Sequence, residues 1–118
     1  MIDLIEKYFD HPDIAIYHND DMLQINQYDV SKALVSLAIE QSLVQVGGSV
    51  VLDVVSDKIF EKYQCHIPEC YEHPEYLNEI LRKLYGNAGK VITKSITTQL
   101  EEFNQHKPIK RFLEVICN

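Results

Sequence analysis

Two cysteines and two histidines lie within nine residues of one another near the middle of the chain, at Cys65, His66, Cys70 and His73. Thiolates and imidazoles are the ligands of tetrahedral zinc sites. Such sites typically use two well-separated pairs, however, and the adjacent Cys65 and His66 would point apart. Because free cysteines are commonly buried as small apolar side chains, we expect a corner between two helices here, without stoichiometric zinc. A metal-binding module that uses all four residues is the alternative.

A second candidate site is basic. Residues 82–100 contain no acid and four bases, which are Arg82, Lys83, Lys90 and Lys94. The segment from Gly86 to Lys90 is weakly similar to a phosphate-binding loop, but two residues separate its glycines where that loop has four, and Val91 replaces the serine or threonine that holds magnesium. We expect a solvated helical face. A binding site for an anion or a nucleic acid is the alternative.

The charge of the chain is −7 and is unevenly distributed. Residues 1–57 carry two bases against ten acids, whereas residues 58–118 carry nine bases against eight acids. A nucleic-acid-binding protein usually needs a concentrated basic face to displace counterions from phosphates. The chain as a whole would be repelled by DNA, so we do not expect nucleic acid as the partner.

No set of residues predicts catalysis. The chain has no Gly-x-Ser-x-Gly motif, and its cysteines lack the context of a protease nucleophile. Asp53, Asp57 and Glu61 share one helix face at four-residue spacing, but Lys58 and Lys62 alternate with them, as on an ordinary solvated surface. We therefore expect a protein that is not an enzyme and needs no cofactor.

Length and composition limit the fold. A chain of 118 residues with 46% hydrophobic and 25% charged residues is typical of one globular domain. The first residues include acids where a secretory signal would be basic, and no apolar run approaches the roughly 20 residues of a membrane span. Three cysteines without a signal peptide indicate reduced thiols. These observations predict a cytoplasmic protein.

The spacing of apolar residues predicts a mainly α fold, an antiparallel bundle of four to five helices. Asp29 is the expected N-cap of the first bundle helix, which ends at Gly47–Gly48 and is apolar on two faces, with Leu37 in the core. A buried strand over Val50–Val55 is the competing prediction for part of the second helix. The expected helices cover residues 30–46, 49–63, 75–85, 88–103 and a short stretch after Pro108.

Residues 1–28 differ from the rest and form an appendage to a bundle domain of residues 29–118. A short helix ends before Pro12, and residues 14–18 and 22–26 alternate in polarity like two strands of a β-hairpin. A lone hairpin is marginal in water, so it must dock on the bundle or pair with another chain. We expect a homodimer in which residues 1–28 contribute to the interface, with a monomer as the alternative.

Four segments carry a family resemblance. They are the run from Ala33-Leu-Val-Ser-Leu37 through Gly47–Gly48, Cys70-Tyr-Glu-His-Pro-Glu-Tyr-Leu77, Leu84-Tyr-Gly-Asn87 and Gln99-Leu-Glu-Glu-Phe103. Over residues 30–116 the chain resembles the NitrOD-type output domains, small helical domains of archaeal signalling proteins. The resemblance implies an archaeal cytoplasmic protein that acts in signal transduction by binding a protein partner or a small ligand. It implies no catalytic residue. The leading hypothesis is thus a non-enzymatic regulatory or interaction domain.

Overall fold

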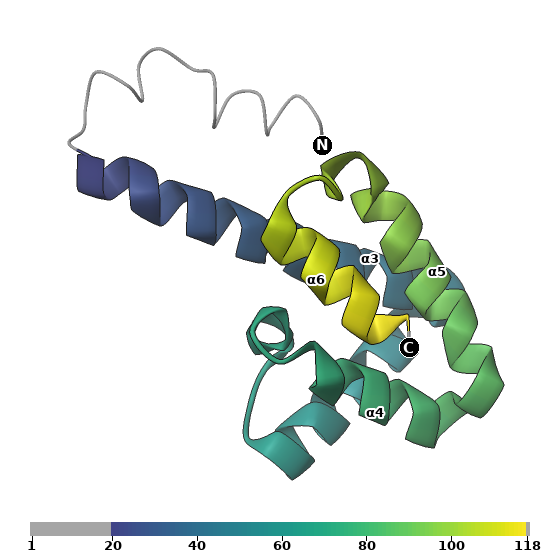
Figure 1. Cartoon of the computed structure of the whole chain (residues 1–118). Helices are drawn as coiled ribbons and strands as arrows, with labels where there is room; N and C mark the ends of the chain where they lie inside the picture. The colour runs from purple at the N-terminus through teal and green to yellow at the C-terminus, as the bar shows by residue number, and fades with distance from the viewer. Residues whose placement is uncertain (1–19, 118) are drawn as a thin grey trace.

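The computed structural model describes residues 20–117, with their side chains from Tyr28 onward, and every element in this part of the chain is helical (Figure 1). The elements in chain order are α3 (Asp20–Tyr63), η1 (Ile67–Tyr71), α4 (Pro74–Tyr85), η2 (Gly86–Ala88), α5 (Gly89–Leu100), η3 (Glu101–Phe103) and α6 (Lys107–Ile116). The predicted mainly α class is confirmed.

The longest element, α3, is two helices joined without a loop. Gly48 alone has a non-helical backbone, with φ 80° and ψ −178°. Glycine adopts such a positive φ without the steric cost that a Cβ atom brings. The two helices predicted over residues 30–46 and 49–63 therefore form one element bent at Gly48, so the predicted division into separate helices is wrong at this point. The competing strand over Val50–Val55 is also wrong, because these residues lie in α3.

The start of α3 corrects the prediction for the N-terminal region. The helix begins at Asp20, so Asp29 is not an N-cap, and residues 22–26 are helical instead of forming the second strand of a hairpin. The first predicted strand and the short helix before Pro12 lie outside the described residues. The predicted boundary at residue 28 falls inside α3. Alternating polarity over five residues is too short a signal to override the helical continuation into a long packed helix.

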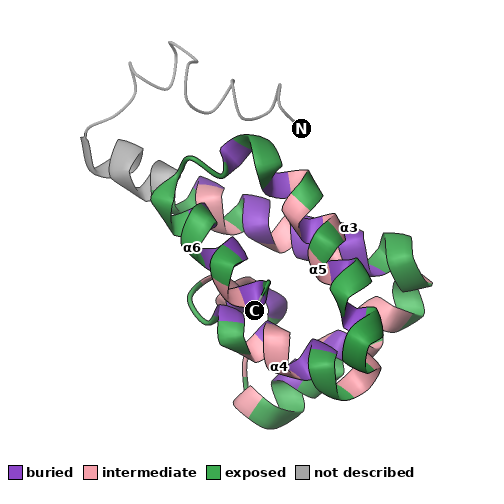
Figure 2. Ribbon diagram, turned by 45° about the vertical axis from the view of Figure 1, so that its right-hand side comes forward, coloured by how far each residue is buried: buried purple, intermediate pink, exposed green. Residues whose placement is uncertain are grey.

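The core is built from the inward faces of all four α-helices together with η1 (Figure 2). In α3 one stripe is buried, which comprises Val30, Leu34, Val35, Ala38, Ile39 and Leu43 before the bend and Val55 and Ile59 after it. Ala33, Val44 and Val46 are exposed and Leu37 is half-buried. The first half of α3 therefore buries one face, and the prediction of two buried faces with Leu37 in the core is wrong.

The C-terminal helices follow the predicted pattern closely. Pro74 is in the first turn of α4, where its missing N–H costs nothing, and Gly86 ends that helix with φ 55°. The segment predicted as one helix over residues 88–103 is α5 continued by the 3₁₀ turn η3. In α6 the buried residues are the four predicted ones, Ile109, Phe112, Leu113 and Ile116.

One stretch of α3, Tyr28–Tyr63, is long and apolar enough to cross a membrane by length and composition alone. This corrects the expectation that no apolar run reaches that length. Only 39% of its most apolar window is buried inside the protein. The core helix of a soluble protein passes the same test, and Gly48 interrupts the helix geometry within this stretch.

Candidate functional site

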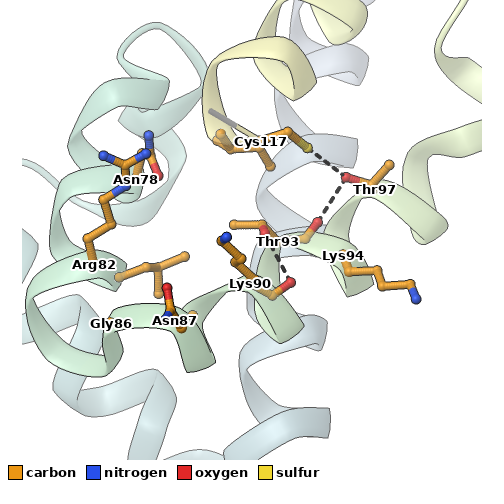
Figure 3. A pocket seen from close by; sticks show the side chains of 12 residues that line it. Asn78, Arg82, Gly86, Asn87, Lys90, Thr93, Lys94, Thr97 and Cys117 are labelled. Carbon is orange, nitrogen blue, oxygen red and sulfur yellow. Dashed lines mark hydrogen bonds between the residues drawn. The ribbon is translucent and has the colours of Figure 1, made fainter.

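A groove lies between α4, α5 and the end of α6, with a volume of about 760 Å³ (Figure 3). That volume falls within the range of about 300–1,000 Å³ that small-molecule sites occupy. Its walls come from segments far apart in sequence. The lining residues are Asn78, Leu81, Arg82, Gly86, Asn87, Gly89, Lys90, Thr93, Lys94, Thr97, Ile116 and Cys117.

The charge of this groove is opposite to that of the chain. Arg82, Lys90 and Lys94 line it, and no aspartate or glutamate does. In Figure 3 the Arg82 side chain runs along α4 towards Asn78, and Lys90 extends from α5 into the space between the helices. Lys94 points away from α4 in the same view. Arg82 and Lys90 therefore bracket the groove from two helices.

Lys83, the fourth predicted basic residue, does not line the groove. Its Nζ lies 3.6 Å from Glu79 Oε2, and the same carboxylate accepts a hydrogen bond from Lys62 of α3. The hydrogen bond from Lys62 lowers the pKa of Glu79. Of the four predicted residues, the structure thus brings three to one groove and places Lys83 in an ion-pair cluster on another face.

Two glycines set the approach of α4 and α5. Gly86 ends α4 in the left-handed region of the backbone map. Gly89, the first residue of α5, is buried, and a Cβ atom there would lie 3.1 Å from the carbonyl oxygen of Leu81. That distance is tighter than most Cβ contacts, so glycine lets the two helices meet closely. The close joint holds Arg82 and Lys90 on opposite sides of one corner.

Hydrogen bonds fix the other walls. The Asn78 amide donates to the Val115 carbonyl oxygen at 3.3 Å, which ties α4 to α6. Within α5, the Thr97 hydroxyl donates to the Thr93 carbonyl at 2.9 Å, and its oxygen also lies 3.4 Å from Cys117 Sγ of α6's C-cap. The α6 wall of the groove had no signal in the sequence, since Ile116 and Cys117 are remote from the basic segment. The absence of acids over residues 82–100 was the one usable signal.

The cysteine–histidine segment does not converge. Cys70 is fully buried in the core, and the Cys65 thiol donates to the Tyr63 carbonyl at 3.4 Å. The His66 ring stacks on Phe60 with centroids 5.3 Å apart, whereas the His73 ring stacks on Tyr76 at 4.6 Å. Among the described residues no three side chains of histidine, cysteine, aspartate or glutamate are placed to hold a metal ion.

The same segment forms the predicted corner between helices. It contains η1, whose N-cap residue is His66. The backbone N–H of His66 donates a hydrogen bond to the Glu69 carboxylate at 2.8 Å. Burial raises the pKa of Cys70 to about 12, so this thiol stays protonated at neutral pH. The weakly phosphate-loop-like Gly86–Lys90 segment is a joint between two helices, with no strand before it.

The chain was compared with models of protein families, with curated proteins and with solved structures, and none of the three comparisons finds a match.

Proposed function

We propose that this chain is a non-enzymatic regulatory domain that binds a small anionic ligand in the groove between α4, α5 and α6. The observation that carries the proposal is the lining of that groove, which has three cationic side chains and no acidic one in a chain whose net charge is −7. Clustered charge of one sign in a concave site raises the local concentration of the opposite ion.

The chemistry of the two bracketing residues favours a phosphate or another compact oxyanion. A guanidinium group binds two oxygens of a phosphate or carboxylate at once, and a lysine ammonium adds a point charge. Arg82 and Lys90 offer this pair from α4 and α5. The amide of Asn87 and the hydroxyl oxygens of Thr93 and Thr97 add polar atoms along the same walls.

The experiment is a titration of the full chain with inorganic pyrophosphate, in which isothermal calorimetry at low ionic strength measures the affinity. Arg82→Gln and Lys90→Gln should each weaken binding about tenfold, because each removes a charge-assisted hydrogen bond. Lys83→Gln is the matched control, since it removes a charge one residue from Arg82 but outside the groove, and it should change the affinity less than about twofold.

Two outcomes would reject the assignment. Wild-type protein that binds no pyrophosphate at millimolar concentration would show that the groove is not an anion site. An equal loss of affinity in Lys83→Gln and Arg82→Gln would show that binding depends on the net charge of the chain and not on the groove.

Raising the salt concentration should weaken specific binding in wild type as well, because the rim of the groove is open to solvent.

The wider role follows the resemblance to NitrOD-type output domains of archaeal signalling proteins. In this proposal the chain is cytoplasmic, folds as an antiparallel bundle and passes the ligand state to a protein partner in signal transduction. The anion-binding groove supplies the ligand site that the resemblance itself does not identify. Affinity purification of a partner with and without pyrophosphate tests this part. If the amount of partner recovered changes neither with pyrophosphate nor with the Arg82→Gln substitution, this part of the proposal is contradicted.

A further inference from the structure

The bend in α3 is made by a single residue. Helix geometry holds up to Gly47 and resumes at Ser49, with only Gly48 outside it. Such a junction differs from an ordinary helix–helix connection of several residues. A change in the φ and ψ angles of Gly48 alone would convert the bent element into one straight helix.

The two halves of α3 make polar and ring-stacking contacts with different elements. Before the bend, the Ser42 hydroxyl accepts a hydrogen bond from the Gln99 side-chain amide of α5 at 3.0 Å. In the same half, Lys32 Nζ lies 3.2 Å from Oε2 of Glu72, the residue that follows η1. After the bend, Tyr63 stacks on Tyr76 of α4 with ring centroids 3.8 Å apart. The half before the bend could therefore make the same contacts with a second copy of the chain, while the half after the bend keeps its contact with α4 of its own copy.

Three valines near the bend are exposed. Val50 is 70% exposed, and Val44 and Val46 are each 43% exposed. Single exposed apolar residues are common on soluble proteins, but these three flank the two glycines on both sides. Val46 and Val50 are four residues apart, so they would share one face of a straight helix.

We infer that α3 has a second, straight form in which two copies of this chain exchange their N-terminal helix halves. Residues 28–47 of one copy would pack on η1 and α5 of the other, which keeps the contacts that Ser42 and Lys32 make within one chain. The valines around Gly48 would then pack between the two crossing helices. Exchange of an identical element between protomers is a low-cost route to a dimer, because it creates few new contacts.

Gly47 gives a way to separate the two forms. In the bent form a Cβ atom at Gly47 would lie 2.1 Å from Val51 Cγ2 and 2.8 Å from Val51 Cβ. In a regular helix the Cβ atoms of residues four apart are about 5–6 Å apart, so alanine at this position fits the straight form. Alanine at Gly48 acts in the same direction, since it disfavours φ 80° and favours helix. Both substitutions penalise the bend and favour the straight helix.

The experiment measures the mass of the full-length Gly47→Ala/Gly48→Ala variant by size-exclusion chromatography with light scattering at about 100 μM. The fraction of dimer should rise at least tenfold over that of wild type. Ser49→Ala, an exposed neighbour in helical geometry, is the matched control and should leave the mass distribution unchanged. Adding Val50→Glu to the double variant should weaken the dimer about tenfold, because Val50 lies between the copies only in the exchanged form.

A cross-link shows which chain each half packs on. Lys32→Cys and Glu72→Cys, two partly exposed positions whose side chains pair across the contact between α3 and the segment after η1, are joined by a short bis-maleimide, in a background with Cys65→Ser and Cys117→Ser. In the exchanged dimer the product is a covalent pair of chains, whereas in the bent monomer it lies within one chain. A dimer whose cross-link stays within each chain would overturn the inference and point to an ordinary dimer through another surface.

A folded glycine variant that remains monomeric would also overturn the inference. If that variant does not fold, wild-type protein carrying the same cross-linking pair is refolded at about 1 mM and treated with the reagent. A slowly dissociating dimer with an inter-chain cross-link supports the exchange. Refolding that yields only intrachain product refutes it.

Discussion

The Gln99 side-chain nitrogen donates a hydrogen bond to the Ser42 hydroxyl at 3.0 Å, across the interface between α5 and α3. Ser42 is the one fully buried polar residue among the described side chains, and the Gln99 oxygen is buried without a partner. The pair joins residues 57 positions apart in the chain. The stability of the contact between α3 and α5 therefore depends on this one pair of polar side chains.

Ser42→Ala should destabilise the protein by about 1–3 kcal/mol, because it leaves the Gln99 amide nitrogen buried without an acceptor. The double variant Ser42→Ala/Gln99→Leu should recover most of this loss, since it removes both the donor and the unpartnered oxygen of Gln99. Chemical denaturation of the two single variants and the double variant measures the coupling. Additive losses in the double variant would contradict the importance of the pair.

Two leucines on the same half-helix should differ in their contribution to stability. Leu43 is fully buried, whereas Leu37 is half-buried and lines a shallow surface groove next to Pro68. Leu43→Ala should cost about 2–5 kcal/mol, and Leu37→Ala should cost less than about 2 kcal/mol, because solvent fills much of the space that it leaves. Urea denaturation compares them directly. If Leu37→Ala lowers the free energy of unfolding as much as Leu43→Ala or more, the face of α3 that contains Leu43 is not the buried one.

The buried Cys70 thiol should make stability fall in alkaline solution. Its pKa is raised by burial from an ordinary value of 9.0 to about 12. Between these values the unfolded chain loses the thiol proton while the folded chain retains it, so the free energy of unfolding decreases as the pH rises from about 9 towards 12. The decrease attributable to this thiol reaches at most about 1.4 kcal/mol per pH unit. Cys70→Ala should remove that part of the slope, measured by urea denaturation between pH 8 and 10.5.

The absolute stability of Cys70→Ala is not the readout, because the variant also loses packing. The pKa of the neighbouring Tyr71 is raised by desolvation as well, and this effect acts in the same direction in both proteins. The comparison is therefore between slopes. Identical slopes for wild type and Cys70→Ala would show that the thiol ionises as easily in the folded protein as in the unfolded one.

The three thiols should react in the order of their exposure. Cys117 is exposed, Cys65 is half-buried and Cys70 is fully buried. Iodoacetamide at pH 8 should modify Cys117 first and Cys70 only after unfolding, because the reactive species is the thiolate and burial suppresses it at Cys70. Mass spectrometry of peptides over time gives the three rates. Modification of Cys70 in folded protein as fast as that of Cys117 would be inconsistent with this core.

The positions of the C-terminal helices could be predicted from local features of the sequence. Pro74 fits only the first turn of a helix, Gly86 provides the positive φ at which α4 ends, and the apolar spacing in α6 marks the four residues that are buried. Each of these signals acts within one or two helical turns, so it does not depend on the rest of the fold. The residues of the corner between α3 and α4 were predictable for the same reason.

The limits of α3 and its buried face were decided by tertiary structure. The sequence marked Gly47–Gly48 as an end, but the chain turns there within one residue and continues as helix, because each half packs on different elements. Apolar periodicity alone gave two possible inward faces, and only packing against α5 and η1 selects the one that contains Leu43 and leaves Val44 and Val46 outside.

For the candidate site, the sequence by itself determined that residues 82–100 carry bases without acids, and the fold decided which of these bases act together. The Arg82 side chain runs along α4 towards Asn78 and lines the groove (Figure 3), whereas the adjacent Lys83 pairs with Glu79. Ile116 and Cys117 complete the groove through the packing of α6 on α4, fixed by the hydrogen bond from Asn78 to Val115. Residue type and local spacing set the available charges, whereas long-range burial of apolar faces brings them around one groove.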